Sequence, residues 1–303
     1  MRIVMTGGTG LIGTALCAAL IKDSHLVTVL SRTPDRSRDM PTGVRVEKWD
    51  TNSIDGWGHL IDGADAVVNL AGAGIADAPW TEKRKHVIRE SRIQVGLILQ
   101  NAIQAAAQKP SIFVQASAVG YYGQEHGDEL ITEASPPGAD FLAKVCFDWE
   151  MSTAPLEHQG IRRVVLRTGI VLSNAGGALP KMTLPFKFFA GGPLGNGNQW
   201  LPWIHIADEV RAIQYLLTHE QTHGPYNLCA PNPVTNKQFS QIVGSQMGRP
   251  AFLPAPAFAI KTVLGEMSTM LLDGQRAIPQ KLEEAGFIFQ YPTAQEALSQ
   301  LLK

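Results

Sequence analysis

Eight residues near the amino terminus have the types and spacing of a phosphate-binding turn. They read Thr6-Gly7-Gly8-Thr9-Gly10-Leu11-Ile12-Gly13 and follow a short apolar run. We expect Gly7 to allow a tight turn, Gly10 to let the backbone approach a pyrophosphate, and Gly13 to let a helix pack closely on a sheet. The unpaired N–H groups at the start of that helix would then face the phosphates. The alternative is a glycine-rich turn that serves only helix-on-strand packing.

A second group of residues bears on which dinucleotide such a site would take. A site for NAD usually has an acidic side chain about 20 residues further on, which binds the ribose hydroxyls. This chain has Ser31 and Arg32 there. Arginine binds phosphate oxygens in bidentate fashion and stays charged, so the pair favours NADP(H) over NAD(H). Alternatively, Arg32 is a solvated loop residue and Asp35 contacts the ribose. Asp50 is a candidate either for the adenine edge or for capping the next helix.

The elements that must position these residues alternate between short apolar runs and helical patterns. Continuous Val, Ile and Leu runs are typical of strands in a parallel sheet that is covered on both faces. The fold class we expect is therefore α/β, a Rossmann-type doubly wound parallel sheet with a smaller mixed lobe on the carboxyl-terminal side. The expected strands are 2–5, 26–30, 44–48, 66–70, 112–116 and 163–166, and the expected helices are 11–22, 82–108 and 139–158.

The organisation changes after residue 172. Residues 173–203 are rich in Gly, Pro, Phe and Trp and lack a clear period, which suggests an insertion that faces the substrate. We expect a dinucleotide-binding domain over 1–170, with a return to the sheet at about 205–228. A smaller substrate domain would comprise 171–204 and 229–303, and its last fifty residues would form a small helical cap.

Composition excludes several classes of function. The chain has 303 residues, a formal net charge of -1 and 17% charged residues, which argues against electrostatic binding of nucleic acid or of an anionic membrane surface. The sequence contains no stretch of 18 apolar residues that would span a membrane. Its three cysteines are far apart and its histidines lack ligand spacing, so no disulfide framework and no metal site is expected. We expect a cytoplasmic protein with a small-molecule partner, and oligomeric state is left open.

Five motifs carry a resemblance to a known family. Asn69-Leu70-Ala71-Gly72 is similar to the fourth-strand motif of the extended short-chain dehydrogenase/reductase superfamily, and its residues Leu70, Ala71 and Gly72 would contact the cofactor. Ser117-Ala118-Val119-Gly120-Tyr121-Tyr122-Gly123 resembles the fifth-strand active-site segment, and Trp203-Ile204-His205-Ile206-Ala207-Asp208 the return motif of the substrate domain. Trp80-Thr81-Glu82-Lys83-Arg84 and Gly274-Gln275-Arg276-Ala277 are similar to an atypical subgroup called epimerase family proteins, which has a small carboxyl-terminal domain.

The resemblance implies a proton relay that this chain only partly retains. Members of the superfamily use a Tyr-x-x-x-Lys pair, in which the tyrosine moves the proton and the lysine holds the nicotinamide ribose. Here Lys144 occupies the lysine position and Asp140 the tyrosine position; an i,i+4 ion pair is the alternative. The serine expected four residues before Tyr122 is displaced to Ser117. Tyr121 is a candidate replacement for the proton carrier, unless it is an ordinary half-buried aromatic.

The same architecture would place several side chains at the substrate cleft. Aromatic rings there stack on rings of a ligand, and lysine holds phosphate or carboxylate. The candidates are Trp80, Tyr122, Lys181, Trp200, Trp203 and His205. Trp200 and Trp203 are alternatively lobe-packing residues, and His205 a structural residue at a helix start. The resemblance implies a NADP(H)-dependent oxidoreductase or epimerase acting on a polar carbonyl or hydroxyl metabolite, for example one like a nucleotide sugar. The alternative is a NADPH-binding sensor or scaffold with little or no turnover.

Overall fold

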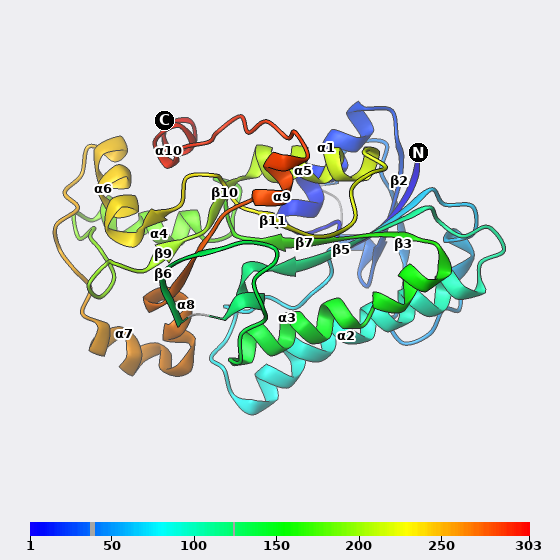
Figure 1. The fold of residues 1–303 in the computed structure, drawn as a ribbon, viewed down its shortest axis with the longest axis horizontal. Coiled ribbons are helices and arrows are strands. Elements are labelled where there is room, and N and C mark those ends of the chain that lie inside the picture. The colour runs from blue at the N-terminus through cyan, green and yellow to red at the C-terminus, as the bar shows by residue number, and fades with distance from the viewer. Residues whose placement is uncertain (37–39, 124) are drawn as a thin grey trace.

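A parallel sheet of seven strands forms the centre of the protein (Figure 1). The structure is a computed structural model that describes residues 1–36, 40–123 and 125–303. The strands of this sheet are β1 (Arg2–Thr6), β2 (Leu26–Ser31), β3 (Arg45–Lys48), β4 (Ala66–Asn69), β5 (Ile112–Ala118), β7 (Arg162–Thr168) and β11 (Gly224–Leu228). Their order is β11-β7-β5-β4-β1-β2-β3, and every neighbouring pair is parallel. The strand order reverses between β1 and β4, because β2 and β3 follow β1 on one side and β5, β7 and β11 follow β4 on the other. Doubly wound folds bind ligands at such a switch point.

Helices cover both faces of this sheet (Figure 1). One face holds α1 (Leu11–Lys22) and α5 (Ile206–Thr218), and the other holds α2 (Glu82–Ala105) and α3 (Phe141–Met151). Met5 packs in the core with α1 and α5, whereas its neighbour Val4 packs in the core with α2. Successive side chains of a strand point to opposite faces of the sheet, and each face here is covered by an apolar core. Residues at all positions of such a strand must therefore be apolar. The α/β doubly wound fold predicted from the apolar runs is confirmed.

A second, mixed lobe packs at one end of the sheet, where its own core surrounds Trp203, Phe186 and Phe239. Its parallel pair β8 (Ile170–Leu172) and β10 (Trp203–His205) leads out of and back into the Rossmann layers. The antiparallel pair is β9 (Trp200–Leu201) with β12 (Val234–Thr235). Its helices are α4 (Leu179–Lys187), α6 (Asn236–Met247), α7 (Ala257–Leu264), η5 (Gly265–Ser268), α8 (Thr269–Leu272) and α10 (Ala294–Leu301). Helix α9 (Gln280–Glu284) packs on the central sheet instead, where Leu282 belongs to the same core as α1 and α5.

Three elements differ from the sequence expectations. The segment without a clear period contains α4, whose Pro180 lies in the first turn and whose Pro185 lies inside the helix, so the usual helical pattern is masked. The expected helix over 139–158 ends at Met151, and a 3-10 helix, η4 (Ala154–Gln159), replaces its last part around Pro155. The carboxyl-terminal cap is not only helical, because β13 (Gly274–Ala277) pairs in parallel with β6 (Glu125–Ile131).

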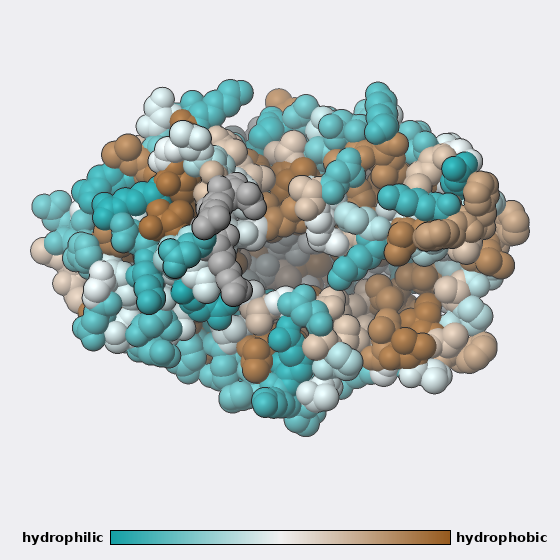
Figure 2. Space-filling view, turned by 180° about the vertical axis from the view of Figure 1, so that it is seen from behind, coloured by the Kyte–Doolittle hydropathy of each residue, from teal (hydrophilic) through white to brown (hydrophobic). Residues whose placement is uncertain are grey.

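The surface is hollowed near the centre of the view in Figure 2, and apolar side chains gather at the end of the molecule that carries α6 and α7. Exposed apolar residues in this lobe include Phe188, Phe252, Phe258 and Val263. Three short 3-10 helices complete the fold: η1 (Pro34–Arg36), η2 (Gly58–Leu60) and η3 (Val119–Tyr122). Within the described ranges, no helix combines the length and apolar character needed to cross a membrane.

Candidate functional site

The glycine-rich segment forms a tight turn between β1 and α1. Gly7 has a φ of 70°, and a Cβ there would lie 2.5 Å from the carbonyl carbon and oxygen of Leu70. A Cβ on Gly13 would lie 2.4 Å from the Gly7 carbonyl oxygen. Side chains at either position would therefore separate α1 from the strand ends. Gly10 is the N-cap of α1, and no side chain in the described part of the protein caps the helix there, so its first N–H groups face outward for an anion.

A cavity of about 750 Å³ opens beside this turn, at the carboxyl ends of β1, β2 and β4. Its volume lies in the range of small-molecule and cofactor sites. The residues that line it include Gly7, Thr9, Gly10, Ser31, Arg32, Leu70, Ala71 and Gly72, all of them among the predicted cofactor residues. Gly8, Leu11, Ile12 and Gly13 lie in the turn and the start of α1, and they are not among the described lining residues. These four residues therefore shape the turn between β1 and α1 and do not form the cavity wall.

The end of β2 presents a hydroxyl and a guanidinium to this cavity. Ser31 is buried and its Oγ accepts the Thr33 N–H at 3.2 Å, whereas Arg32 is exposed. Asp50, the third candidate, is exposed, and its Oδ1 accepts the N–H groups of Asn52 at 2.9 Å and Ser53 at 3.2 Å. These backbone hydrogen bonds lower the pKa of Asp50. They close a turn and do not cap a helix, because the next helix begins at Gly58 with Trp57 as its N-cap.

Two side chains of α2 hold the loop after β4 by hydrogen bonds to the backbone N–H and carbonyl of Ala73. Ser91 Oγ accepts the Ala73 N–H at 3.0 Å, and Arg92 Nη1 donates to the Ala73 carbonyl at 3.0 Å. Burial lowers the pKa of Arg92. The guanidinium also lies against Gly72, where an added Cβ would be 2.9 Å from its Cζ. Ser91 and Arg92 thus position the wall of the cavity.

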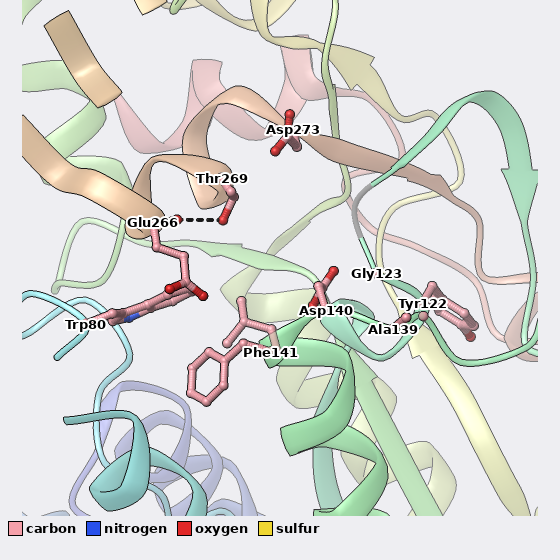
Figure 3. Close-up of a pocket in the computed structure, with 11 residues that line it drawn as sticks. Trp80, Tyr122, Gly123, Ala139, Asp140, Phe141, Glu266, Thr269 and Asp273 are labelled. Carbon is pink, nitrogen blue, oxygen red and sulfur yellow. Dashed lines mark hydrogen bonds between the residues drawn. The ribbon is translucent and has the colours of Figure 1, made fainter. Parts of the chain in front are cut away.

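A second cavity, of about 420 Å³, forms a cleft between the two lobes (Figure 3). Trp80 and Phe141 supply an aromatic wall, with their ring centroids 5.1 Å apart in edge-to-face contact. Asp140 lines the cleft and caps α3, because its Oδ1 accepts the Ala143 N–H at 2.9 Å. The opposite wall comes from η5 and α8, which contribute Glu266 and Thr269. Figure 3 shows the Glu266 carboxylate directed toward the aromatic wall.

The predicted relay residues are only partly brought together. Asp140 lines the cleft, while Lys144 lies one turn further along α3 on an exposed face. Among the described side chains, no ion pair joins Asp140 to Lys144, so the i,i+4 pair is not formed. Tyr121 is half-buried and stacks on the Arg167 guanidinium, whose Cζ lies 3.5 Å from the ring centroid.

The hydroxyls of Ser117 and Tyr122 belong to a buried polar network. Ser117 Oγ donates to Glu150 Oε1 at 2.7 Å, and Tyr122 donates to Asn227 Oδ1 at 2.7 Å. Arg167 joins the two branches, because it donates to Glu150 and, at 3.0 Å, to the Tyr122 hydroxyl oxygen. Burial raises the pKa of Tyr122 above its ordinary value. Tyr122 lines the cleft, but its ring is turned away from the aromatic wall (Figure 3).

The other predicted substrate residues occupy different surroundings. Lys181 is exposed on α4 and lines a separate cavity. Trp200 Nε1 donates to Asp128 Oδ1 at 2.8 Å, and the Arg276 guanidinium stacks on its ring. Trp203 is buried in the core of the second lobe, which favours the packing alternative.

His205 acts as the N-cap of α5, because its Nδ1 accepts the Ala207 N–H at 3.0 Å. Its Nε2 hydrogen-bonds to Gln300 at 2.9 Å, and burial lowers its pKa. This arrangement favours the structural alternative for His205.

Sequence reasoning missed the cleft wall formed by Glu266, Thr269 and Asp273. Their spacing of three and four residues in an otherwise apolar stretch is the signal that would have placed them on one helical face. Glu150 and Arg167 were also missed, because a buried ion pair between residues 17 positions apart leaves no local pattern.

Comparison with known proteins identifies two family regions in the chain. Residues 3–229 match the NAD dependent epimerase/dehydratase family, and residues 255–301 match a domain of unknown function, DUF1731. An epimerase family protein of Mycobacterium leprae is 40% identical over 299 residues, which cover 98% of this chain and 94% of the relative. The epimerase family protein YfhF of Bacillus subtilis is 39% identical over 310 residues, with 100% and 98% covered.

A solved structure gives the same result for the whole fold. The human epimerase family protein SDR39U1, crystallised with NADPH, superposes with a TM-score of 0.90 at 35% identity, over 100% of this chain and 99% of the human one. The resemblance drawn from the motifs is confirmed. The chain belongs to the NAD dependent epimerase/dehydratase family, as an epimerase family protein with a carboxyl-terminal DUF1731 domain.

Proposed function

We propose that this protein is a NADP(H)-binding enzyme that reduces or oxidises a small polar carbonyl or hydroxyl metabolite. The observation that carries the proposal is the cavity at the switch point of the sheet, which joins the Gly7–Gly13 turn to Ser31 and Arg32. A helix N-terminus and a guanidinium together suit the pyrophosphate and the 2'-phosphate of one dinucleotide. The human relative that was crystallised with NADPH has the same fold at 35% identity, which supports the preference for NADP(H).

Lys144 on α3 and the residues of the cleft would divide the remaining tasks. When bound, NADP(H) would supply a hydride to a carbonyl carbon or accept one from the corresponding carbinol. Lys144 would hold the nicotinamide ribose. Asp140 would exchange the proton with the substrate oxygen through Oδ2, since Oδ1 accepts the Ala143 N–H. Trp80 and Phe141 would orient the substrate against the polar wall.

The test of the cofactor assignment is the affinity for NADPH and NADH, measured by calorimetry for the wild type and for Arg32→Glu. Losing a charge-assisted contact of about 1.5 to 3 kcal/mol lowers the NADPH affinity roughly 10- to 100-fold. NADH affinity should change little. Arg249→Glu is the matched control, because Arg249 is exposed in the second lobe and lies outside the described lining of the cavity. An unchanged ratio of NADPH to NADH affinity in Arg32→Glu would contradict the assignment.

The placement of Ser117 and Tyr122 supports a second candidate function, a sensor that binds NADPH without turnover. Both hydroxyls are engaged in the buried network, so neither is free to move a substrate proton. A sensor binds NADPH but does not oxidise it in the presence of any carbonyl compound.

Asp140→Asn separates the two candidates. Asparagine also caps helices, so the stability of α3 should be retained. For an enzyme, loss of the carboxylate lowers NADPH turnover about 100- to 10,000-fold, while the NADPH affinity stays the same. The assay is NADPH absorbance over a panel of aldehydes, ketones and sugars. Equal turnover in Asp140→Asn and the wild type would rule out Asp140 as the proton carrier, and a wild type that oxidises no NADPH would favour the sensor.

A further inference from the structure

A third cavity, which we call the apolar chamber, lies behind the η5–α8 wall of the cleft. Its volume is about 370 Å³, and both lobes contribute to it. Ala76 comes from the β4–α2 loop, Met182 and Phe186 from α4, and Phe239 from α6. Met267 and Met270 close it from η5 and α8. The chamber is lined mainly by aliphatic, aromatic and thioether groups.

The apolar chamber and the cleft share two walls. The β4–α2 loop gives Ala76 to the chamber and Trp80 to the cleft. The η5–α8 segment gives Glu266 and Thr269 to the cleft and Met267 and Met270 to the chamber. Side chains three residues apart share a helical face, so this segment is polar toward the cleft and apolar toward the chamber. Figure 3 shows the polar side of this segment facing the cleft.

Lys181 is the one charged residue among the described residues that line the apolar chamber. Two other polar residues there are already engaged with the backbone: Asn236 Oδ1 accepts the Leu194 N–H at 2.7 Å, and Ser240 Oγ donates to the Gly192 carbonyl at 3.3 Å. A diphosphate needs several cationic or N–H donors. One ammonium beside a large apolar surface suits a singly charged amphiphile instead.

The volume limits the size of the occupant. An apolar cavity of about 150 Å³ holds one benzene ring. At that ratio the chamber of about 370 Å³ takes roughly 15 carbon atoms. The methionines of η5–α8 are flexible and polarisable, so the chamber can adapt to a straight chain or a ring.

We propose that the apolar chamber binds the hydrocarbon part of a medium-sized carboxylate, with the carboxylate at Lys181 Nζ. This inference goes beyond the proposed function and does not rest on it, because no described residue lines both the chamber and the cleft. Binding of the hydrocarbon part is itself independent of dinucleotide.

The test is calorimetric titration of decanoate, below its micelle-forming concentration, and of 1-decanol, below its solubility limit, into the protein without dinucleotide. The wild type should bind both. Lys181→Gln should weaken decanoate binding roughly threefold to tenfold and leave 1-decanol unchanged. Lys187→Gln is the matched control, because Lys187 is an exposed lysine on the same helix that lies outside the described lining of the chamber.

Two variants that occupy the chamber complete the test. Ala76→Trp enters it from an exposed loop position, and Met270→Glu places a negative charge inside it, which repels a carboxylate and disfavours a hydrocarbon chain. Each should abolish binding of decanoate and 1-decanol while the NADPH-induced thermal shift persists, which shows that the variant is folded. Binding that survives both variants, or a wild type that binds neither compound, would overturn the chamber proposal. If NADPH binds but decanoate does not, only the chamber proposal fails; if NADPH does not bind, the proposed function fails.

Discussion

At the scale of single residues, Glu209 combines deep burial with an incomplete set of partners. Its side chain is 1% exposed on α5, and Thr168 Oγ1 donates to its Oε1 at 2.9 Å. Its Oε2 has no hydrogen-bond partner among the described residues. Burial raises the pKa of Glu209 from 4.5 to about 8. The folded protein therefore retains a proton that the unfolded chain has already released.

Glu209→Gln should change how stability depends on pH. The folded-state pKa is the higher one, so the stability that the protonated carboxyl contributes is complete below about pH 4.5 and is lost as the pH rises toward about 8. Each pKa unit corresponds to about 1.4 kcal/mol. Glutamine does not titrate, so the variant should gain stability relative to the wild type between pH 5 and pH 8.5.

Urea unfolding at pH 5, 7 and 8.5 measures this difference in the free energy of unfolding. Glu220→Gln is the control, because Glu220 is exposed just after the same helix. A stability difference between Glu209→Gln and the wild type that stays constant over this range would show that Glu209 is ionised throughout in the folded state.

Residue types alone could predict most of the residues around the proposed cofactor cavity. They could predict fewer of the residues that line the cleft. Gly7 and Gly13 were predictable because close backbone approach at both, and a positive φ at Gly7, require glycine whatever surrounds it. The surroundings of Ser117 and His205 were not, because each hydroxyl or imidazole has partners more than 30 residues away along the chain. Residue type indicates that a group can hydrogen-bond, and only the fold determines its partner.

At the scale of elements, an ion pair joins α3 to β7 beneath the cleft. Arg167 donates to both carboxylate oxygens of Glu150, at 3.0 and 2.9 Å, and the two side chains are 5% and 11% exposed. Ser117 on β5 donates to the same carboxylate. This network holds the helix that starts at Asp140 against the end of the sheet.

Breaking this pair from one side should be strongly destabilising. Arg167→Met leaves the Glu150 carboxylate buried without its cation, which costs about 3 to 5 kcal/mol. The double variant Arg167→Met with Glu150→Met should recover much of that loss, because no charge remains buried. The free energy of unfolding in urea measures both.

A surface ion pair provides the comparison. Arg89 on α2 pairs with Asp148 on α3 at 2.8 Å, with side chains 47% and 34% exposed. Asp148→Ala should cost less than about 1 kcal/mol. Equal losses for Arg167→Met and Asp148→Ala would mean that the buried network does not hold α3 in place.

A helix or strand could be predicted from the sequence where the pattern that specifies it lies within its own residues. The extent of α1 was predicted correctly, and the ends of β1 and β2 within one residue, because apolar periodicity and flanking glycines lie within each segment. Helix α4 was missed because Pro185 interrupts its pattern, and its stability comes from packing Phe186 into the second core. The pairing of β13 with β6 joins residues more than 140 positions apart, which no local pattern indicates.

At the scale of the whole molecule, the carboxyl-terminal segment is joined to the Rossmann layers at the start of α5. Asp208 accepts the N–H groups of Gln290 and Tyr291, both at 2.8 Å, and its side chain is fully buried. His205 contacts Gln300 in α10 one turn earlier. These contacts hold the carboxyl-terminal segment against the helical layer that carries α5. Division into two domains at about residue 170 remains a prediction.

The central claim is that the glycine turn holds a NADP(H) molecule in the cavity at the switch point. The most direct measurement is the thermal shift of the wild type and of Gly7→Ala with NADPH, NADP, NADH and NAD. Gly248→Ala is the control, because Gly248 also has a positive φ, 61°, but an added Cβ meets nothing within 4 Å.

NADPH at 100 times its Kd should stabilise the wild type and Gly248→Ala by about 2.7 kcal/mol, and NAD(H) should stabilise them much less. Gly7→Ala should lose the NADPH response, because its Cβ would displace the Leu70 carbonyl that it meets at 2.5 Å. A wild type whose melting temperature does not change with any of the four dinucleotides, or a Gly7→Ala variant that is stabilised as much as Gly248→Ala, would contradict the claim.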